Sequence, residues 1–96
     1  MGTSLHPPSA AALARRAGLS VSRLSRLFKS ETGVELAAAV RTARLRHAAE
    51  MLVLSTRSVK QIADAVGFRS TSHFIARFRR EFGTTPRQYR RKAARP

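Results

Sequence analysis

The chain has 96 residues, 43% of them hydrophobic, which suits one small domain and is too apolar for a disordered chain. It has no cysteine, which excludes disulfide bonds and thiolate metal sites. Nineteen Lys and Arg against five Asp and Glu give a net charge of +14, and this self-repulsion favours a polyanionic partner. No apolar run approaches the roughly 18–20 residues of a membrane span, so we expect a cytoplasmic protein without membrane contact.

Most of the basic residues are Arg rather than Lys. The planar guanidinium of Arg presents two N–H groups in a fixed fork that matches a phosphate or a guanine edge, whereas the Lys ammonium is a point charge without that geometry. A GC-rich coding bias also enriches Arg, so the preference over Lys has two explanations. The bias does not explain the scarcity of acidic residues.

The first predicted element is a short helix. Residues 1–8 should form an extended lead-in, because the Pro7-Pro8 pair prevents a helix from passing through it. The helix should then run from Ser9 to Ala17, and Gly18 should end it.

The second predicted helix follows immediately and completes a first helix-turn-helix over residues 9–35. Ser20 is its expected N-cap, and Gly33 its left-handed C-terminal residue. Four residues at helical spacing are expected to face inward: Val21, Leu24, Leu27 and Phe28.

A longer helix is expected from about Leu36 to Leu54, within a central segment of residues 36–57. Arg44 interrupts its apolar side, and we interpret this residue as structural, bonding helix ends across the subdomains rather than contacting DNA. The apolar side consists of Leu36, Val40, Ala43, Leu45, Ala48, Ala49 and Leu52.

Two capping boxes mark the C-terminal part of the chain, one at Ser58–Gln61 and one at Thr85–Gln88. The first should begin a helix that ends near Gly67, and the second a final helix with Pro86 at its favoured first position. Between them, a helix beginning near Ser70 should turn Phe74 and Phe78 inward and end at Gly83. Residues 58–91 therefore form a second helix-turn-helix with a final helix, followed by a frayed basic tail over residues 92–96.

The chain nearly repeats itself. At an offset of 49, Leu13-Ala14 and Gly18-Leu19 match Ile62-Ala63 and Gly67-Phe68. At an offset of 50, the matched residues are Phe28, Glu31 and Gly33 with Phe78, Glu81 and Gly83. The second copy thus carries one extra residue, which a turn can absorb but a helix interior cannot without rotating its face by about 100°. We place it at Arg69-Ser70.

These motifs together resemble the DNA-binding domain of AraC-type bacterial transcription regulators. The most specific stretch is Ile62-Ala63 with Gly67-Phe68, Phe74, Phe78, Phe82-Gly83, Pro86 and Tyr89-Arg90. The resemblance implies an all-α, homeodomain-like fold of seven helices, in which a long central helix joins two helix-turn-helix subdomains. It also implies recognition helices at about residues 20–32 and 70–82, bound in successive major-groove segments of double-stranded DNA.

Three departures from the family pattern are visible. The family has a helix before the first helix-turn-helix, and we expect it to be truncated or absent because only residues 1–8 precede Ser9. Leu36 and Ala39 stand where the family has Pro and Tyr. Ala76 stands where the family often carries an Arg in the second recognition helix.

The resemblance assigns base reading to Ser22, Ser25, Arg26, Ser72, His73 and Ala76. Among these Arg26 is the strongest candidate, since an Arg can bind guanine O6 and N7 together. The expected phosphate contacts, which position the protein without specifying a sequence, are Arg23, Lys29, Arg69, Thr71, Arg77, Arg87 and Arg90. For each of these side chains the competing interpretation is an ordinary solvated surface residue. Short side chains at 72 and 76 favour shape-based readout by the second helix.

The predicted function is sequence-specific DNA binding as part of a bacterial transcription regulator. The expected partners are DNA, an effector or dimerisation domain not contained in this chain, and RNA polymerase. No cofactor, metal site or enzymatic activity is expected, because no catalytic constellation or metal-ligand spacing is found. Two alternatives remain: a nucleic-acid or membrane binder driven by charge alone, and an interaction module. The sequence further predicts specificity near Arg26 and stability in residues 58–91.

Overall fold

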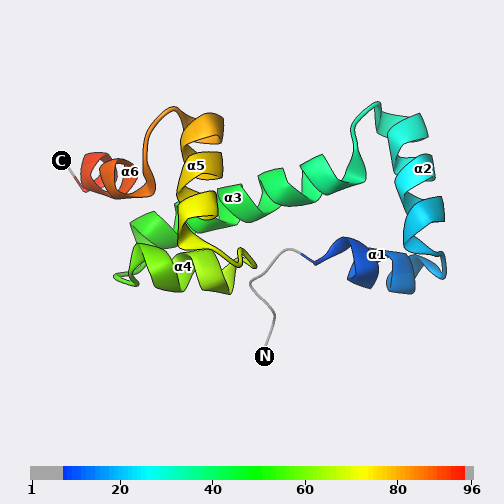
Figure 1. Cartoon of the computed structure of the whole chain (residues 1–96), viewed down its shortest axis with the longest axis horizontal. Coiled ribbons are helices and arrows are strands. Elements are labelled where there is room, and N and C mark those ends of the chain that lie inside the picture. The colour runs from blue at the N-terminus through cyan, green and yellow to red at the C-terminus, as the bar shows by residue number, and fades with distance from the viewer. Residues whose placement is uncertain (1–7, 95–96) are drawn as a thin grey trace. The chain divides into compact units, whose positions relative to one another are not determined.

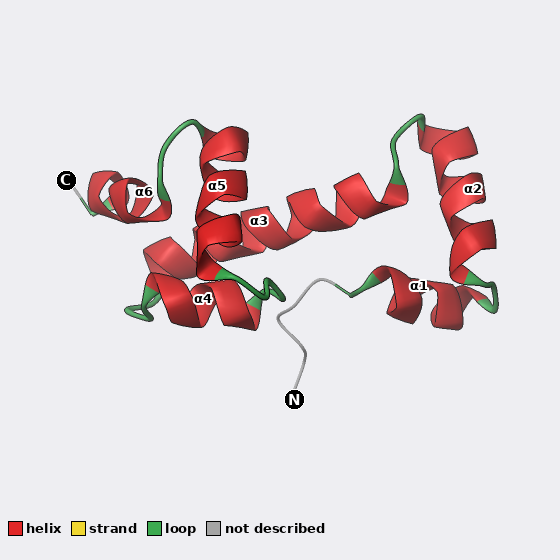
Figure 2. Cartoon of the chain, in the orientation of Figure 1, coloured by secondary structure: helices red, strands yellow, loops and turns green. Residues whose placement is uncertain are grey.

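The computed structural model describes residues 8–94, and in this range all regular structure is helical (Figure 1 and Figure 2). The six helices are α1 (Ala10–Ala17), α2 (Val21–Thr32), α3 (Leu36–Leu54), α4 (Val59–Ala65), α5 (Thr71–Phe82) and α6 (Pro86–Ala93). The all-α prediction is confirmed. The extended lead-in predicted for residues 1–8 lies, except for Pro8, outside the described residues.

The described chain divides into two units, residues 8–43 and residues 44–94, which we call the N-terminal and the C-terminal unit. The boundary falls within α3, so this helix contributes its first turns to one unit and its remaining turns to the other. Each unit contains one helix-turn-helix, formed by α1 and α2 or by α4 and α5.

Side-chain hydroxyl caps begin five of the helices, and three of them, Ser20, Ser58 and Thr85, were predicted from the sequence. The hydroxyl groups of Ser9, Ser20, Ser58, Ser70 and Thr85 each accept a backbone N–H three residues later. Both predicted capping boxes are present, and Pro86 occupies the start of α6. However, α6 continues to Ala93, so Lys92 and Ala93 lie on a helix rather than in the frayed tail we expected.

The internal repeat appears in the hydrogen bonds of the two turns. The amide of Leu19 donates to the carbonyl of Ala14 at 2.9 Å, and Phe68 donates to Ala63 at 2.9 Å, an offset of 49. The next capping residues, Ser20 and Ser70, are related by an offset of 50. The extra residue of the second copy is therefore Arg69, within the turn where the sequence placed it.

The core of the C-terminal unit is aromatic and completely enclosed. Phe74 and Phe78 of α5 have no exposed surface, and Phe78 contacts the rings of both Phe82 and Tyr89. Residues of α3, of α4 and the C-cap of α4 complete this core: Leu45, Ala48, Ala49, Leu52, Ile62, Ala63 and Val66. Stability therefore depends on the second half of α3 as well as on residues 58–91.

The core of the N-terminal unit is much smaller. Its only buried hydrophobic residues among those described are Ala14 and Leu36, and α2 has no buried residue. Leu24 and Phe28 are half-buried, but Val21 and Leu27 are 44% and 46% exposed, so the predicted inward stripe is wrong at these two positions. Leu27 is exposed because it lies about 100° around the helix from Phe28, and Val21 because it lies in the first turn, at the end of the helix. Within this unit, only the eight-residue α1 and the first turns of α3 can cover α2.

Two arginines of the C-terminal unit, Arg90 and Arg44, make contacts within the unit instead of extending freely into solvent. The guanidinium of Arg90 on α6 donates to the carbonyl oxygens of Leu52 at 2.9 Å and Ser55 at 3.1 Å, which have no partner further along α3. The guanidinium of Arg44 lies against Gly67, only 3.3 Å from where a side-chain Cβ would stand. Gly67 has a φ of +93°, so this turn needs glycine for its backbone and for its packing.

Candidate nucleic-acid interface

The exposed face of α2 is centred on Arg26. At 100° per residue, Ser22, Arg26 and Lys29 fall on one strip opposite Leu24 and Phe28. All three strip residues are exposed, and so is Arg23 at the edge of the strip. Ser25 is half-buried, on the side that packs inward. The face can thus present a long guanidinium between two flanking cations, which is suited to a base edge between two phosphates.

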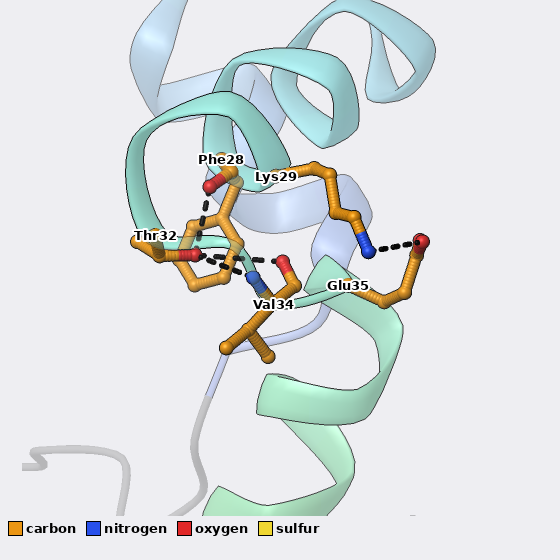
Figure 3. A network of polar contacts seen from close by, with 5 residues as sticks. All are labelled: Phe28, Lys29, Thr32, Val34 and Glu35. Atoms are coloured by element: carbon orange, nitrogen blue, oxygen red, sulfur yellow. Dashed lines mark hydrogen bonds and ion pairs between the residues drawn. The ribbon is translucent and has the colours of Figure 1, made fainter.

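The C-terminal end of α2 is held by a small polar network (Figure 3). The Thr32 hydroxyl donates to the Phe28 carbonyl at 2.8 Å and accepts the Val34 amide at 3.1 Å. Lys29 Nζ lies 3.2 Å from a carboxylate oxygen of Glu35, although both side chains are more than half exposed. An exposed ion pair of this kind is weak, so Lys29 remains available to a stronger anion.

The exposed face of α5 has different chemistry. Ser72 and Ala76 occupy its centre, where short side chains leave the backbone accessible, and Arg79 and Arg80 extend it toward the C-terminus. His73 is exposed at its edge, with its ring perpendicular to that of Phe68 at a centroid distance of 5.6 Å.

The remaining predicted phosphate contacts are not equivalent. Arg69, in the turn before α5, and Arg87, in the first turn of α6, are exposed. Thr71 and Arg77 are half-buried on α5. Arg90 is half-buried as well, and its two carbonyl bonds give it a structural function that the sequence did not reveal.

The repeat aligns the two faces residue by residue. At an offset of 50, Arg26 corresponds to Ala76 and Lys29 to Arg79. Arg79, which sequence reasoning did not select, therefore occupies the position of Lys29, which it selected on α2. Arg80 corresponds to Ser30, so the repeat does not indicate it, although its side chain is exposed. The offset itself was the sequence signal that indicates Arg79.

In the part of the chain that the structure describes, no three His, Asp or Glu side chains are grouped so that they could hold a metal ion. No described helix combines the length and the apolarity needed to cross a membrane.

Known proteins resemble this arrangement over nearly its full length. A family model described as a helix-turn-helix domain matches residues 13–92. The HTH-type transcriptional regulator GlxA of Rhizobium meliloti (strain 1021) is 40% identical over 94 residues, or 97% of this chain and 29% of that protein. The Xylose operon regulatory protein of Escherichia coli (strain K12) is 33% identical over 76% of this chain and 19% of its own length. The chain thus spans less than a third of these curated relatives.

Solved structures agree with the sequence matches. An AraC-type DNA-binding regulator from Chromobacterium violaceum has a TM-score of 0.80 at 36% identity, covering 94% of this chain and 80% of its own. The DNA-binding domain of AdpA, determined in complex with a target DNA, has a TM-score of 0.77 at 32% identity, covering 93% and 80%.

Proposed function

The chain belongs to the AraC-type helix-turn-helix family, and from this premise we propose that it binds double-stranded DNA sequence-specifically. In this proposal it is the DNA-binding part of a bacterial transcription regulator, acting in the cytoplasm and by binding rather than by catalysis. The observation that carries the proposal is the exposed face of α2, where Arg26 stands between Ser22 and Lys29 on a capped helix that packs through Leu24 and Phe28.

We assign base reading to the central strips of the two recognition helices. On α2, Arg26 is the principal reader, and a bidentate contact to guanine discriminates by about 1–3 kcal/mol. On α5, Ser72 and Ala76 bring the backbone close to the groove, and the methyl group of Ala76 suits a thymine methyl group. His73 and the half-buried Ser25 are the remaining candidates.

Phosphate contacts are assigned to exposed cations beside these strips. The main members of this group are Arg23, Lys29, Arg69 and Arg87. Arg79 joins it because the repeat aligns it with Lys29, and Arg80 because it is an exposed cation next to Arg79. Arg90 contributes less, since its guanidinium is bonded to two carbonyl groups of its own unit. We propose that the two units occupy successive segments of one duplex.

The relatives' greater length supports a further domain in the whole regulator, for effector binding or dimerisation. RNA polymerase is a candidate partner of the bound complex. An interaction module without DNA affinity is the competing interpretation, and a binder driven only by the +14 charge is another.

Equilibrium titration separates these interpretations. A duplex selected from a random pool should bind at least about a thousandfold more tightly than random duplex at one fixed salt concentration. Arg26→Ala should reduce that preference, whereas Arg23→Ala should weaken binding to both duplexes alike. A steep salt dependence without any preference would establish binding by charge alone. Absence of DNA binding would favour the interaction module.

A further inference from the structure

The imidazole of His73 is held in place by a residue outside the recognition helix. Phe68 lies in the turn before α5, and its ring meets that of His73 at 5.6 Å and 74°, an edge-to-face geometry. The same Phe68 ring meets Phe74 at 5.4 Å and 62°. Phe68 therefore connects an exposed side chain to a fully buried one.

Phe68 is itself fixed. Its amide donates to the carbonyl of Ala63 at 2.9 Å, and its half-buried ring packs against the aromatic core of the C-terminal unit. On the other side of the contact, the His73 amide donates to the hydroxyl of Ser70 at 3.2 Å. Both backbones are thus anchored, and the ring contact restricts the remaining freedom of the imidazole.

The N-terminal unit has no such device. The repeat aligns Phe68 with Leu19, which has no ring, and His73 with Arg23, a long and exposed side chain. A flexible cation suits a phosphate, whose position along a groove varies little with sequence. A rigid ring with hydrogen-bonding nitrogen atoms is suited to a hydrogen bond with one atom at a defined position. The loss of side-chain entropy has already occurred in the free protein, so it does not oppose binding.

We propose that Phe68 is a positioning residue that presents His73 to a hydrogen-bonding atom on a base edge, so that His73 determines specificity in the segment bound by α5. The proposal rests on the proposed function, because it concerns the same DNA-binding face. It gives α5 a directional polar contact that Ser72 and Ala76, with their short side chains, do not supply.

The free protein allows a first test that does not depend on DNA. Ring currents from Phe68 should shift the carbon-bound proton signals of the His73 imidazole in an NMR spectrum. In Phe68→Leu these signals should move toward the values of an unstructured His, while those of His47 stay in place. Unchanged His73 signals would overturn the positioning part of the proposal.

The second test is a double-mutant cycle on the selected duplex. His73→Ala should weaken specific binding by about two- to tenfold and remove the preference at one base pair, with random-duplex binding unchanged. Phe68→Leu should cause part of the same loss and no further loss in the His73→Ala background. The proposal would be contradicted if the losses of affinity caused by the two substitutions were additive. It would also be contradicted if His73→Ala weakened binding to random duplex equally, as expected for a phosphate contact.

Phe82→Leu is the matched control. Phe82 is another partly buried ring of the same core, in contact with Phe78 and Tyr89, and no ring contact joins it to His73. It should lower the unfolding temperature as Phe68→Leu does, yet leave the base preference intact. If both variants lose the preference equally, Phe68 acts only through stability. If wild-type protein shows no preference for any duplex, the proposed function fails while the NMR result still stands.

Discussion

The two units share one repeated helix-turn-helix pattern but differ in the size of their cores and in the side chains on their exposed faces. The C-terminal unit encloses Phe74 and Phe78 completely, fixes the end of α3 with Arg90, and presents short side chains on α5. The N-terminal unit buries only Ala14 and Leu36 among the described hydrophobic residues, yet it presents Arg26. A good fold and a good base-reading face are thus separable properties, because they depend on opposite sides of the same helix.

The largest difference is expected from truncating the equivalent aromatic residues of α5 and α2. Phe78→Ala removes a fully buried ring and should lower the free energy of unfolding of the C-terminal unit by about 3–5 kcal/mol. Phe28→Ala removes a half-buried ring and should cost clearly less. Urea unfolding followed by circular dichroism measures both, and equal losses would mean that the two cores are equally important.

Substitution of two arginines of α6, Arg90 and Arg87, should affect two different properties, the stability of the C-terminal unit and its binding to DNA. Arg90→Met removes hydrogen bonds to Leu52 and Ser55 and should lower the free energy of unfolding by about 1.5–3 kcal/mol. Arg87→Met should leave stability within about 0.5 kcal/mol and reduce the slope of log K against log salt by about 0.9. Thermal unfolding and salt titrations give the two readouts. The comparison fails if Arg90→Met changes the salt slope and not the stability.

Ala76→Arg should make the second recognition helix resemble the first. The new side chain would occupy the position that corresponds to Arg26 and should add about 1–3 kcal/mol of preference for guanine in the segment bound by α5. Selection from a random duplex pool would reveal the new base preference, with Ala76→Lys as a control that adds the same charge without the planar guanidinium. An unchanged motif would show that α5 does not lie in the groove as α2 does.

The smallest difference is expected between the equivalent glycines of the two turns. Gly18→Ala places a Cβ in open space at a φ of +70° and should cost about 1–2 kcal/mol. Gly67→Ala meets the guanidinium of Arg44 at 3.3 Å as well, so its loss should be larger. Thermal unfolding of the two variants tests this order. The reverse order would mean that the contact with Arg44 does not contribute to the cost of a side chain at position 67.

Local sequence signals predicted most of the fold. Capping hydroxyls, glycines and the two-copy pattern located five of the described helices, and apolar residues at helical spacing located α3, because each of these features acts over a few residues. Exposure of Val21 and Leu27 could not be predicted in the same way, since it depends on how much neighbouring surface is available to cover α2. The partner of Arg90 was equally hidden, because Leu52 and Ser55 are more than thirty residues away in the sequence.

The sequence alone was enough to select candidate DNA-contacting residues, whereas the contacts that these residues make within the protein are visible only in the structure. The central strip of α2 follows from helical spacing, so Ser22 and Arg26 could be selected from the sequence alone. The contact between Phe68 and His73 could not, because it depends on the course of the turn that contains the inserted Arg69. These residue roles remain predictions until they are measured on DNA.

The most direct measurement is a cycle that pairs Arg26→Ala with a single base change in the selected duplex. Fluorescence anisotropy gives the four dissociation constants at one salt concentration. We predict that replacing one G·C pair weakens wild-type binding by about tenfold or more and leaves the binding of Arg26→Ala nearly unaffected. If every base pair has the same cost in both proteins, Arg26 does not read the sequence and the proposed division between the two units is wrong.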